Sequence, residues 1–347
     1  MTTTFVSVDD NNRKIVYDVV SLPIIDEPSQ RADAVAAVDV LLLHGMAPVG
    51  RKCWGLIDHT NNNSLMKNGK LASENINTFI KSIQQHSNNE ISHVRLIMPD
   101  RPGYCDSDAA PSVKENGCDE DDVATRGYSY EQFATDMLTV IEHATADDVV
   151  DDVDNDDDVN QSRKKHLIIL GTSSGGPCSL SLRNRILSET TSLLPNHTFL
   201  GTILCSSDCP YSHPQCPQAV REEDTKDLNG RSIHQYAQDE SLKKFRKKSK
   251  HGFVTDYLLE RSDWGFDLAA PHVHSDRAHH SGKTVHMYTG GENDYKSIRL
   301  GAPFLKELIG DDAARLEVLD DEDHFYASRK PEVLAKLLAT MIRFRPR

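Results

Sequence analysis

One short stretch constrains the fold of this chain more than any other. It reads His166-Leu-Ile-Ile-Leu-Gly171-Thr-Ser173-Ser-Gly175-Gly176. The apolar run predicts a buried parallel strand, and the glycines predict a sharp turn into a helix. Ser173 has glycine two positions before it and two positions after it, which is the pattern of a nucleophile elbow. In such a turn the strained serine backbone lifts the hydroxyl above the sheet, and the positive end of the following helix points at the site. Ser173 is therefore the predicted nucleophile.

The rest of the chain predicts an α/β fold. Apolar runs typical of strands alternate with amphipathic helical patterns, which favours a mostly parallel central sheet with helices on both faces. The predicted strands are 38–43, 93–98, 166–170, 199–205, 284–288 and 315–319, after a hairpin of 5–8 and 14–20. The predicted helices are 73–85, 130–143, 298–309 and 331–342, besides the helix that follows Ser173.

Two segments interrupt this alternation. Residues 209–282 are polar, rich in histidine and only locally helical, so we expect a lid inserted over the carboxyl edge of the sheet. The core then comprises residues 1–208 and 283–347. Residues 147–163 begin with a nearly continuous acidic run that lacks the central glycine and closing glutamate of an EF-hand. They are predicted to be a solvated surface loop within the core.

A serine nucleophile needs a histidine to accept its proton and a carboxylate to orient that histidine. In a fold of this kind the three residues follow one another as serine, acid and histidine, on loops after strands. Asp294 follows the strand 284–288 on a glycine-rich loop, and His324 follows the last strand. We therefore predict the catalytic residues Ser173, Asp294 and His324. Asp208 remains the alternative acid, and Ser174 the alternative nucleophile.

Two backbone N–H groups are expected to stabilise the oxyanion. One belongs to Ser174, directly after the nucleophile, and the other belongs to Met46, which follows His44-Gly45 at the end of a predicted strand. The alternative for His44-Gly45 is a simple turn that ends the strand.

Together these motifs resemble the α/β-hydrolase superfamily, in its single-domain form with a serine nucleophile and a lid. The segments that carry the resemblance are Leu41-Leu42-Leu43-His44-Gly45, Pro99-Asp100-Arg101-Pro102-Gly103-Tyr104-Cys105-Asp106-Ser107-Asp108, Gly171-Thr172-Ser173-Ser174-Gly175-Gly176, the loop 291–294 and Asp323-His324-Phe325. Members commonly have glycine where Cys105 stands, and a small hydrophobic residue or histidine where Thr172 stands. The resemblance implies catalysis without a cofactor. It also implies that Trp264, in Trp264-Gly265-Phe266-Asp267, lines the substrate pocket, since a similar stretch closes the lid in some members.

Composition excludes several classes of partner. The net charge of −14, from 53 acidic and 39 basic residues, argues against a nucleic-acid partner. No apolar run is long enough to span a bilayer, and the polar start lacks the layout of a secretory signal, so a cytoplasmic protein is expected. The chain has seven cysteines, an odd number, which favours reduced thiols over a framework of disulfides. The basic run 243–248 either attracts anionic substrates or a lipid surface, or is a solvated helix face.

The candidate zinc ligands Cys205, Cys209, Cys216 and His213 match no common zinc spacing, so no metal is expected. The predicted function is hydrolysis of a small carboxylic ester, or a related acyl bond, through an acyl-enzyme. The alternatives are an aminopeptidase of the proline-iminopeptidase kind, a slow or non-catalytic ligand-binding protein, and carbon–carbon or cyanohydrin chemistry on the same residues.

Overall fold

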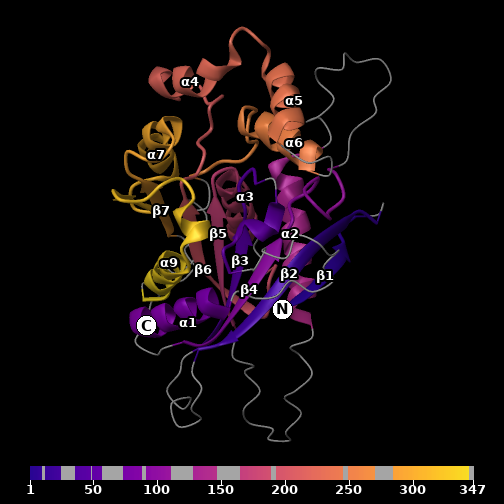
Figure 1. The fold of residues 1–347 in the computed structure, drawn as a ribbon, viewed down its shortest axis with the longest axis vertical. Coiled ribbons are helices and arrows are strands. Elements are labelled where there is room, and N and C mark those ends of the chain that lie inside the picture. The colour runs from indigo at the N-terminus through magenta and orange to yellow at the C-terminus, as the bar shows by residue number, and fades with distance from the viewer. Residues whose placement is uncertain are drawn as a thin grey trace, which may run out of the picture.

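An eight-stranded sheet forms the centre of the computed structural model (Figure 1). The structure describes residues 1–9, 12–24, 36–47, 49–56, 73–87, 91–110, 128–146, 165–188, 193–244, 249–269 and 284–343. The strands are β1 (Thr2–Ser7), β2 (Lys14–Pro23), β3 (Ala36–Leu43), β4 (Ile91–Pro99), β5 (Lys165–Thr172), β6 (His197–Cys205), β7 (Val285–Gly290) and β8 (Ala314–Leu319). Their order across the sheet is β1-β2-β4-β3-β5-β6-β7-β8.

The sheet is mostly parallel, as the sequence predicts. β1 and β2 form an antiparallel hairpin, and β2 pairs antiparallel with β4. From β4 to β8 every pairing is parallel. The register sets Leu43 opposite Gly171 and Thr172 opposite Cys205. Because the carboxyl ends of parallel strands meet at one edge, the loops after β3, β5, β6, β7 and β8 gather there.

Alternate residues of the central strands face two separate cores. Leu41 and Leu43 of β3 belong to one core and Val40 and Leu42 to the other. This alternation is the period-two geometry of a strand, and it explains why these strands are apolar throughout. The first core is covered by α2 (Tyr130–Thr145), α3 (Gly175–Ser188) and α7 (Lys296–Ile309), and the second by α1 (Ser73–Ser87) and α9 (Pro331–Arg343).

The described part of the predicted lid consists of short helices above the carboxyl edge of the sheet (Figure 1). They are α4 (Gln218–Thr225), η5 (Lys226–Leu228), α5 (Ile233–Lys244) and α6 (Lys250–Glu260). Phe253 and Tyr257 of α6 pack with Ala237 of α5 on Tyr104, so a small third core joins the lid to the loop after β4. The lid boundaries at 209 and 282 stay predictions.

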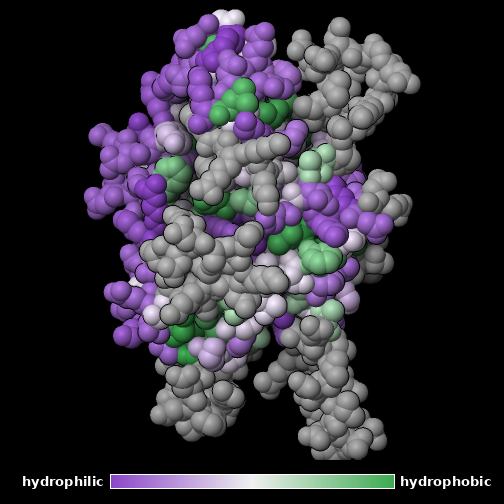
Figure 2. Space-filling view, turned by 45° about the vertical axis from the view of Figure 1, so that its right-hand side comes forward, coloured by the Kyte–Doolittle hydropathy of each residue, from purple (hydrophilic) through white to green (hydrophobic). Residues whose placement is uncertain are grey.

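Two predicted surface features lie wholly or mainly outside the described residues: the acidic loop 147–163 and most of the basic run 243–248. On the face shown in Figure 2, the described surface is mainly hydrophilic, with small apolar patches. Within the described residues, no helix has both the length and the apolar character needed to cross a membrane.

Candidate active site

Ser173 occupies the sharp turn between β5 and α3. Its φ is 50°, in the left-handed region that residues other than glycine rarely adopt. The turn is held by two backbone bonds: the Ser173 N–H donates to the Cys205 carbonyl (3.0 Å), and the Gly176 N–H donates to the Ser173 carbonyl (2.8 Å). The side chain is half-buried at the carboxyl edge of the sheet. This is the strained turn that the G-x-S-x-G pattern predicts.

Close packing explains one glycine of this turn and one glycine that follows β3. A Cβ on Gly45 would lie 2.8 Å from the Ser173 Cβ, and a Cβ on Gly175 would lie 2.4 Å from the Leu43 carbonyl oxygen. The end of β3 therefore lies directly against the turn. Thr172 adds a hydrogen bond between the turn and the end of β3, because its hydroxyl accepts the Gly45 N–H (3.1 Å). A polar residue at 172 thus has a structural role in this chain.

His324 and Asp294 form a hydrogen-bonded pair at the same edge. His324 follows β8, and its Nδ1 lies 2.8 Å from the Asp294 Oδ1. The other oxygen, Oδ2, accepts the Ser206 hydroxyl (2.5 Å) and the Gly290 N–H (2.9 Å). Burial would raise the pKa of Asp294, but the hydrogen bonds from His324 and Ser206 outweigh it and hold that pKa below its usual value. An ionised carboxylate only accepts, so Nδ1 of His324 donates to it, and in the neutral ring Nε2 is then the acceptor.

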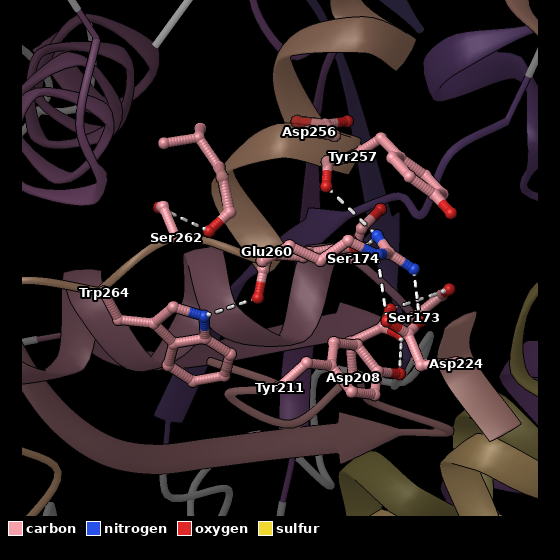
Figure 3. A network of polar contacts seen from close by, with 12 residues as sticks. Ser173, Ser174, Asp208, Tyr211, Asp224, Asp256, Tyr257, Glu260, Ser262 and Trp264 are labelled. Carbon is pink, nitrogen blue, oxygen red and sulfur yellow. Dashed lines mark hydrogen bonds and ion pairs between the residues drawn. The ribbon is translucent and has the colours of Figure 1, made fainter. Parts of the chain in front are cut away.

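The Ser173 hydroxyl contacts a different carboxylate. It donates to the Asp208 Oδ2 at 3.3 Å, while the Tyr211 hydroxyl donates to the Asp208 Oδ1 at 2.7 Å (Figure 3). Among the described residues, no hydrogen bond joins Ser173 to His324. The structure thus pairs His324 with Asp294, and Ser173 with Asp208, the residue held as the alternative acid.

The two predicted oxyanion donors have free N–H groups. Within the described part of the chain, neither the Met46 N–H nor the Ser174 N–H donates a hydrogen bond. Ser174 immediately precedes α3, whose N-terminus adds positive potential. The Ser174 hydroxyl is buried and accepts a hydrogen bond from Arg101 Nη2 (2.8 Å), which leaves it poorly placed as the alternative nucleophile.

His44 is fully buried, and its Nε2 accepts the Arg101 N–H (3.2 Å). Burial, and then the charge of Arg101, lower the pKa of His44 well below its usual value. We therefore assign His44 a structural role, as a neutral ring that holds the loop after β4 against the end of β3.

Sequence reasoning assigned no role to a group of charged residues around the turn. Arg101 Nη2 pairs with the Asp256 Oδ2 of α6 (2.7 Å), and the Tyr104 hydroxyl donates to the same carboxylate. Burial raises the pKa of Asp256 to about 6 despite the Arg101 charge. Glu260 lies one turn further along α6 and is 2% exposed. Their spacing of four residues, which places both on one face of a helix, was the signal available in the sequence.

Trp264 is buried beside this group. Its indole N–H donates to the Glu260 carbonyl (3.2 Å), and its ring contacts Tyr130 and Phe266. Trp264 lines a surface hollow of about 750 Å³, whose lining includes neither Ser173 nor His324. A contact between Trp264 and substrate stays a prediction. Within the described residues no group of three or more His, Cys, Asp or Glu side chains is arranged to hold a metal ion, the four candidate zinc ligands included.

Comparison with known proteins identifies the fold. No protein-family model matches the chain, and no curated protein matches it. An esterase from Thermogutta terrifontis aligns over 99% of this chain and 98% of its own, at 15% identity and a TM-score of 0.51. A bromoperoxidase from Bacillus anthracis aligns over 99% of this chain and 100% of its own, at 12% identity and a TM-score of 0.51. A structure from a study of Nitrososphaera gargenis carboxylesterases aligns over 98% of this chain and 99% of its own, at 15% identity and a TM-score of 0.52. At such identities the likeness establishes the fold that these proteins share.

Proposed function

We propose that this chain, which has the α/β-hydrolase fold, is a serine hydrolase that cleaves carboxylic esters through an acyl-enzyme. Ser173 attacks the carbonyl carbon, His324 accepts the Ser173 proton, and Asp294 orients His324 and stabilises its charged form. The observation that carries the proposal is the combination of a strained serine with a histidine–carboxylate pair at the same edge of the sheet.

The tautomer of His324 supports this assignment of roles. Because Nδ1 donates to Asp294, Nε2 is left to accept a proton. In the proposed reaction the Ser173 hydroxyl turns away from Asp208 and donates to this nitrogen. The imidazolium that forms is stabilised by Asp294, whose ionised state is favoured by the hydrogen bonds from Ser206 and Gly290.

The free N–H groups of Met46 and Ser174 suit the second requirement, which is stabilisation of the oxyanion. The tetrahedral intermediate collapses when His324 gives its proton to the leaving alcohol. A water molecule then attacks the acyl carbon, His324 takes the water proton, and Ser173 is regenerated.

Ester hydrolysis agrees with two of the structural neighbours, which are described as an esterase and as carboxylesterases. The Asp208 carboxylate, 3.3 Å from the Ser173 hydroxyl, favours a second candidate within the same mechanism, the hydrolysis of aminoacyl substrates. The remaining alternative is a ligand-binding protein with the same fold, and the experiment below distinguishes it from a hydrolase.

The test is covalent labelling with a fluorophosphonate probe, which reacts with activated serines. We expect the native chain to be labelled, and Ser173→Ala and His324→Ala to lose labelling. Exposed His251 provides a matched control, since His251→Ala should be labelled at the native rate. A folded native chain that resists the probe would contradict the proposal and favour a binding protein.

A further inference from the structure

One exposed tyrosine lies directly against the imidazole of His324. All ten tyrosines of the chain are among the described residues, and Tyr295 alone is exposed, at 56%. Its ring centroid lies 4.3 Å from that of His324, and the two ring planes are inclined by 43°. Among the described residues the Tyr295 hydroxyl forms no hydrogen bond. The aromatic ring, and not the hydroxyl, therefore makes the contact with the site.

The backbone of Tyr295 is held by the carboxylate that orients His324. Its N–H donates to the Asp294 Oδ1 (2.7 Å), the same oxygen that lies 2.8 Å from Nδ1 of His324. Tyr295 immediately precedes α7, and its carbonyl accepts the Arg299 N–H (3.1 Å) in the first turn of that helix. The ring therefore extends from a backbone position that Asp294 and a helix both fix.

Phe325 contacts the same imidazole but already carries another cation. Its ring centroid lies 5.0 Å from that of His324, at an interplanar angle of 86°. The guanidinium carbon of Arg329 lies 4.3 Å from the Phe325 centroid. The centroids of Tyr295 and Phe325 are 6.5 Å apart, so the two rings approach the imidazole from different directions. Within the described part of the chain no lysine or arginine lies over Tyr295, which leaves its ring to His324.

A cation forms at His324 during the proposed reaction. As the Ser173 Oγ bonds to the carbonyl carbon, the carbonyl electron pair moves to its oxygen and the serine proton moves to Nε2 of His324. The face of an aromatic ring is negative and attracts a cation within about 6 Å of the ring centroid. This attraction is stronger for the imidazolium than for the neutral imidazole, so it stabilises the transition state more than the bound substrate.

We propose that Tyr295 is a positioning residue for this reaction, whose ring holds the His324 imidazole in place and stabilises its charged form. This inference rests on the proposed function and adds a residue that acts through His324. Asp294 binds the imidazole at Nδ1, whereas Tyr295 packs against the ring itself. Because Tyr295 is exposed, we expect an effect of about two- to fivefold on the rate, the range of a cation–π contact at an exposed position.

The first experiment measures hydrolysis of 4-nitrophenyl acetate by the native chain, Tyr295→Phe and Tyr295→Leu. Rates are expressed per fluorophosphonate-labelled serine, so the fraction of active protein cancels. His324 accepts a proton both when the acyl-enzyme forms and when water cleaves it. Tyr295→Leu should therefore lower kcat by about two- to fivefold and leave KM nearly unchanged. Tyr295→Phe keeps the ring and should keep the native kcat.

Phe5 provides the matched control, because it is an exposed aromatic residue (53%) on β1, at the other edge of the sheet. Phe5→Leu should retain the native kcat. The rate constant of fluorophosphonate labelling depends on the same proton transfer, and it should fall in Tyr295→Leu by the same factor as kcat. A Tyr295→Leu protein with the native kcat and the native labelling rate would overturn the inference.

A second comparison separates charge stabilisation from packing. Pentafluorophenylalanine has nearly the size of phenylalanine, but its fluorine atoms reverse the sign of the potential on the ring face. With this residue at position 295, kcat should be lower than in Tyr295→Phe by about two- to fivefold or more. Equal kcat in these two proteins would overturn the inference, and the comparison holds even if Tyr295→Leu does not fold.

Fluorophosphonate labelling of the native chain separates this inference from the proposed function. A native chain that is labelled at Ser173, with Tyr295 variants that all react at the native rate, retains the hydrolase mechanism and contradicts the role of Tyr295. A folded native chain that is neither labelled nor active on the ester contradicts both.

Discussion

At the scale of single residues, two serines of the site share a left-handed backbone conformation. Ser173 (φ 50°) and Ser206 (φ 48°) use this conformation to direct their hydroxyls to Asp208 and Asp294. Cys105 (φ 42°) shares the conformation, and the resemblance noted in the sequence predicts glycine at this position. Because a side chain in this region costs roughly 1–2 kcal/mol, glycine suits position 105 for a steric reason.

Cys105→Gly should therefore stabilise the protein. We expect the free energy of unfolding to rise by about 1 kcal/mol, since relief of the steric cost exceeds the loss of chain entropy and of the weak thiol contact with Ser249 (3.7 Å). Urea denaturation measures the change. Cys53, whose φ is not positive, is the matched control, and Cys53→Gly should destabilise. A less stable Cys105→Gly protein would show that the thiol contacts outweigh the strain.

At the scale of elements, one buried ion pair connects the lid to the nucleophile turn. Arg101, in the loop after β4, donates to Ser174 and also pairs with Asp256 of α6. Loss of one partner would leave a buried charge uncompensated, which costs much more than loss of a pair at the surface. The lid helix and the turn at Ser173 are therefore coupled through one guanidinium.

Asp256→Asn should lower the free energy of unfolding by about 3–5 kcal/mol at pH 8. Burial raises the pKa of Asp256 to about 6, so the carboxylate is ionised at pH 8. Asp239 of α5 is 50% exposed and pairs with Arg231, which precedes that helix, at 3.1 Å. Loss of this surface pair in Asp239→Asn should lower the free energy of unfolding by about 1 kcal/mol or less. Chemical denaturation of both variants tests the comparison. Equal losses would mean that the Arg101–Asp256 pair has no special role.

At the scale of the whole molecule, a second polar cluster ties the sheet together at the opposite end of the central strands. Asp39 of β3 accepts hydrogen bonds from Arg95 of β4 (2.9 Å) and His197 of β6 (2.8 Å). Burial would raise the pKa of Asp39, but these hydrogen bonds outweigh it and lower the pKa below its usual value. A carboxyl with a lowered folded-state pKa stabilises the fold above its unfolded-state pKa of about 3.9, and this contribution is lost as the pH falls through the folded-state value.

Asp39→Asn should consequently destabilise the protein at pH 7 and progressively less as the pH falls below about 4. Unfolding monitored from pH 7 to pH 3 should show the native and variant curves converging toward the acid end. Exposed Asp321 supplies the control, since Asp321→Asn should follow the native curve throughout. Parallel curves for Asp39→Asn would contradict the linkage.

Much of the fold was predictable because its signals are local. The apolar runs at 38–43 and 166–170 predict strands buried on both faces, and β3 and β5 contain them. Ser129 immediately precedes the predicted helix 130–143, and its hydroxyl caps α2 by accepting the Gln132 N–H (3.2 Å). The left-handed turn at Ser173 follows from its flanking glycines. Strand and helix periods, caps and turns depend on neighbours a few residues apart, which a sequence displays directly.

The sequence by itself thus determined the order of elements, the strained turn and the chain order of Ser173, Asp294 and His324. Only the tertiary structure decided that Asp294 contacts His324, that Asp208 contacts Ser173, and that a lid helix brings Asp256 to Arg101 beside Ser174. These contacts join residues separated by 30 or more positions in the chain. Their geometry depends on how the sheet and the lid pack together, and no local pattern encodes it.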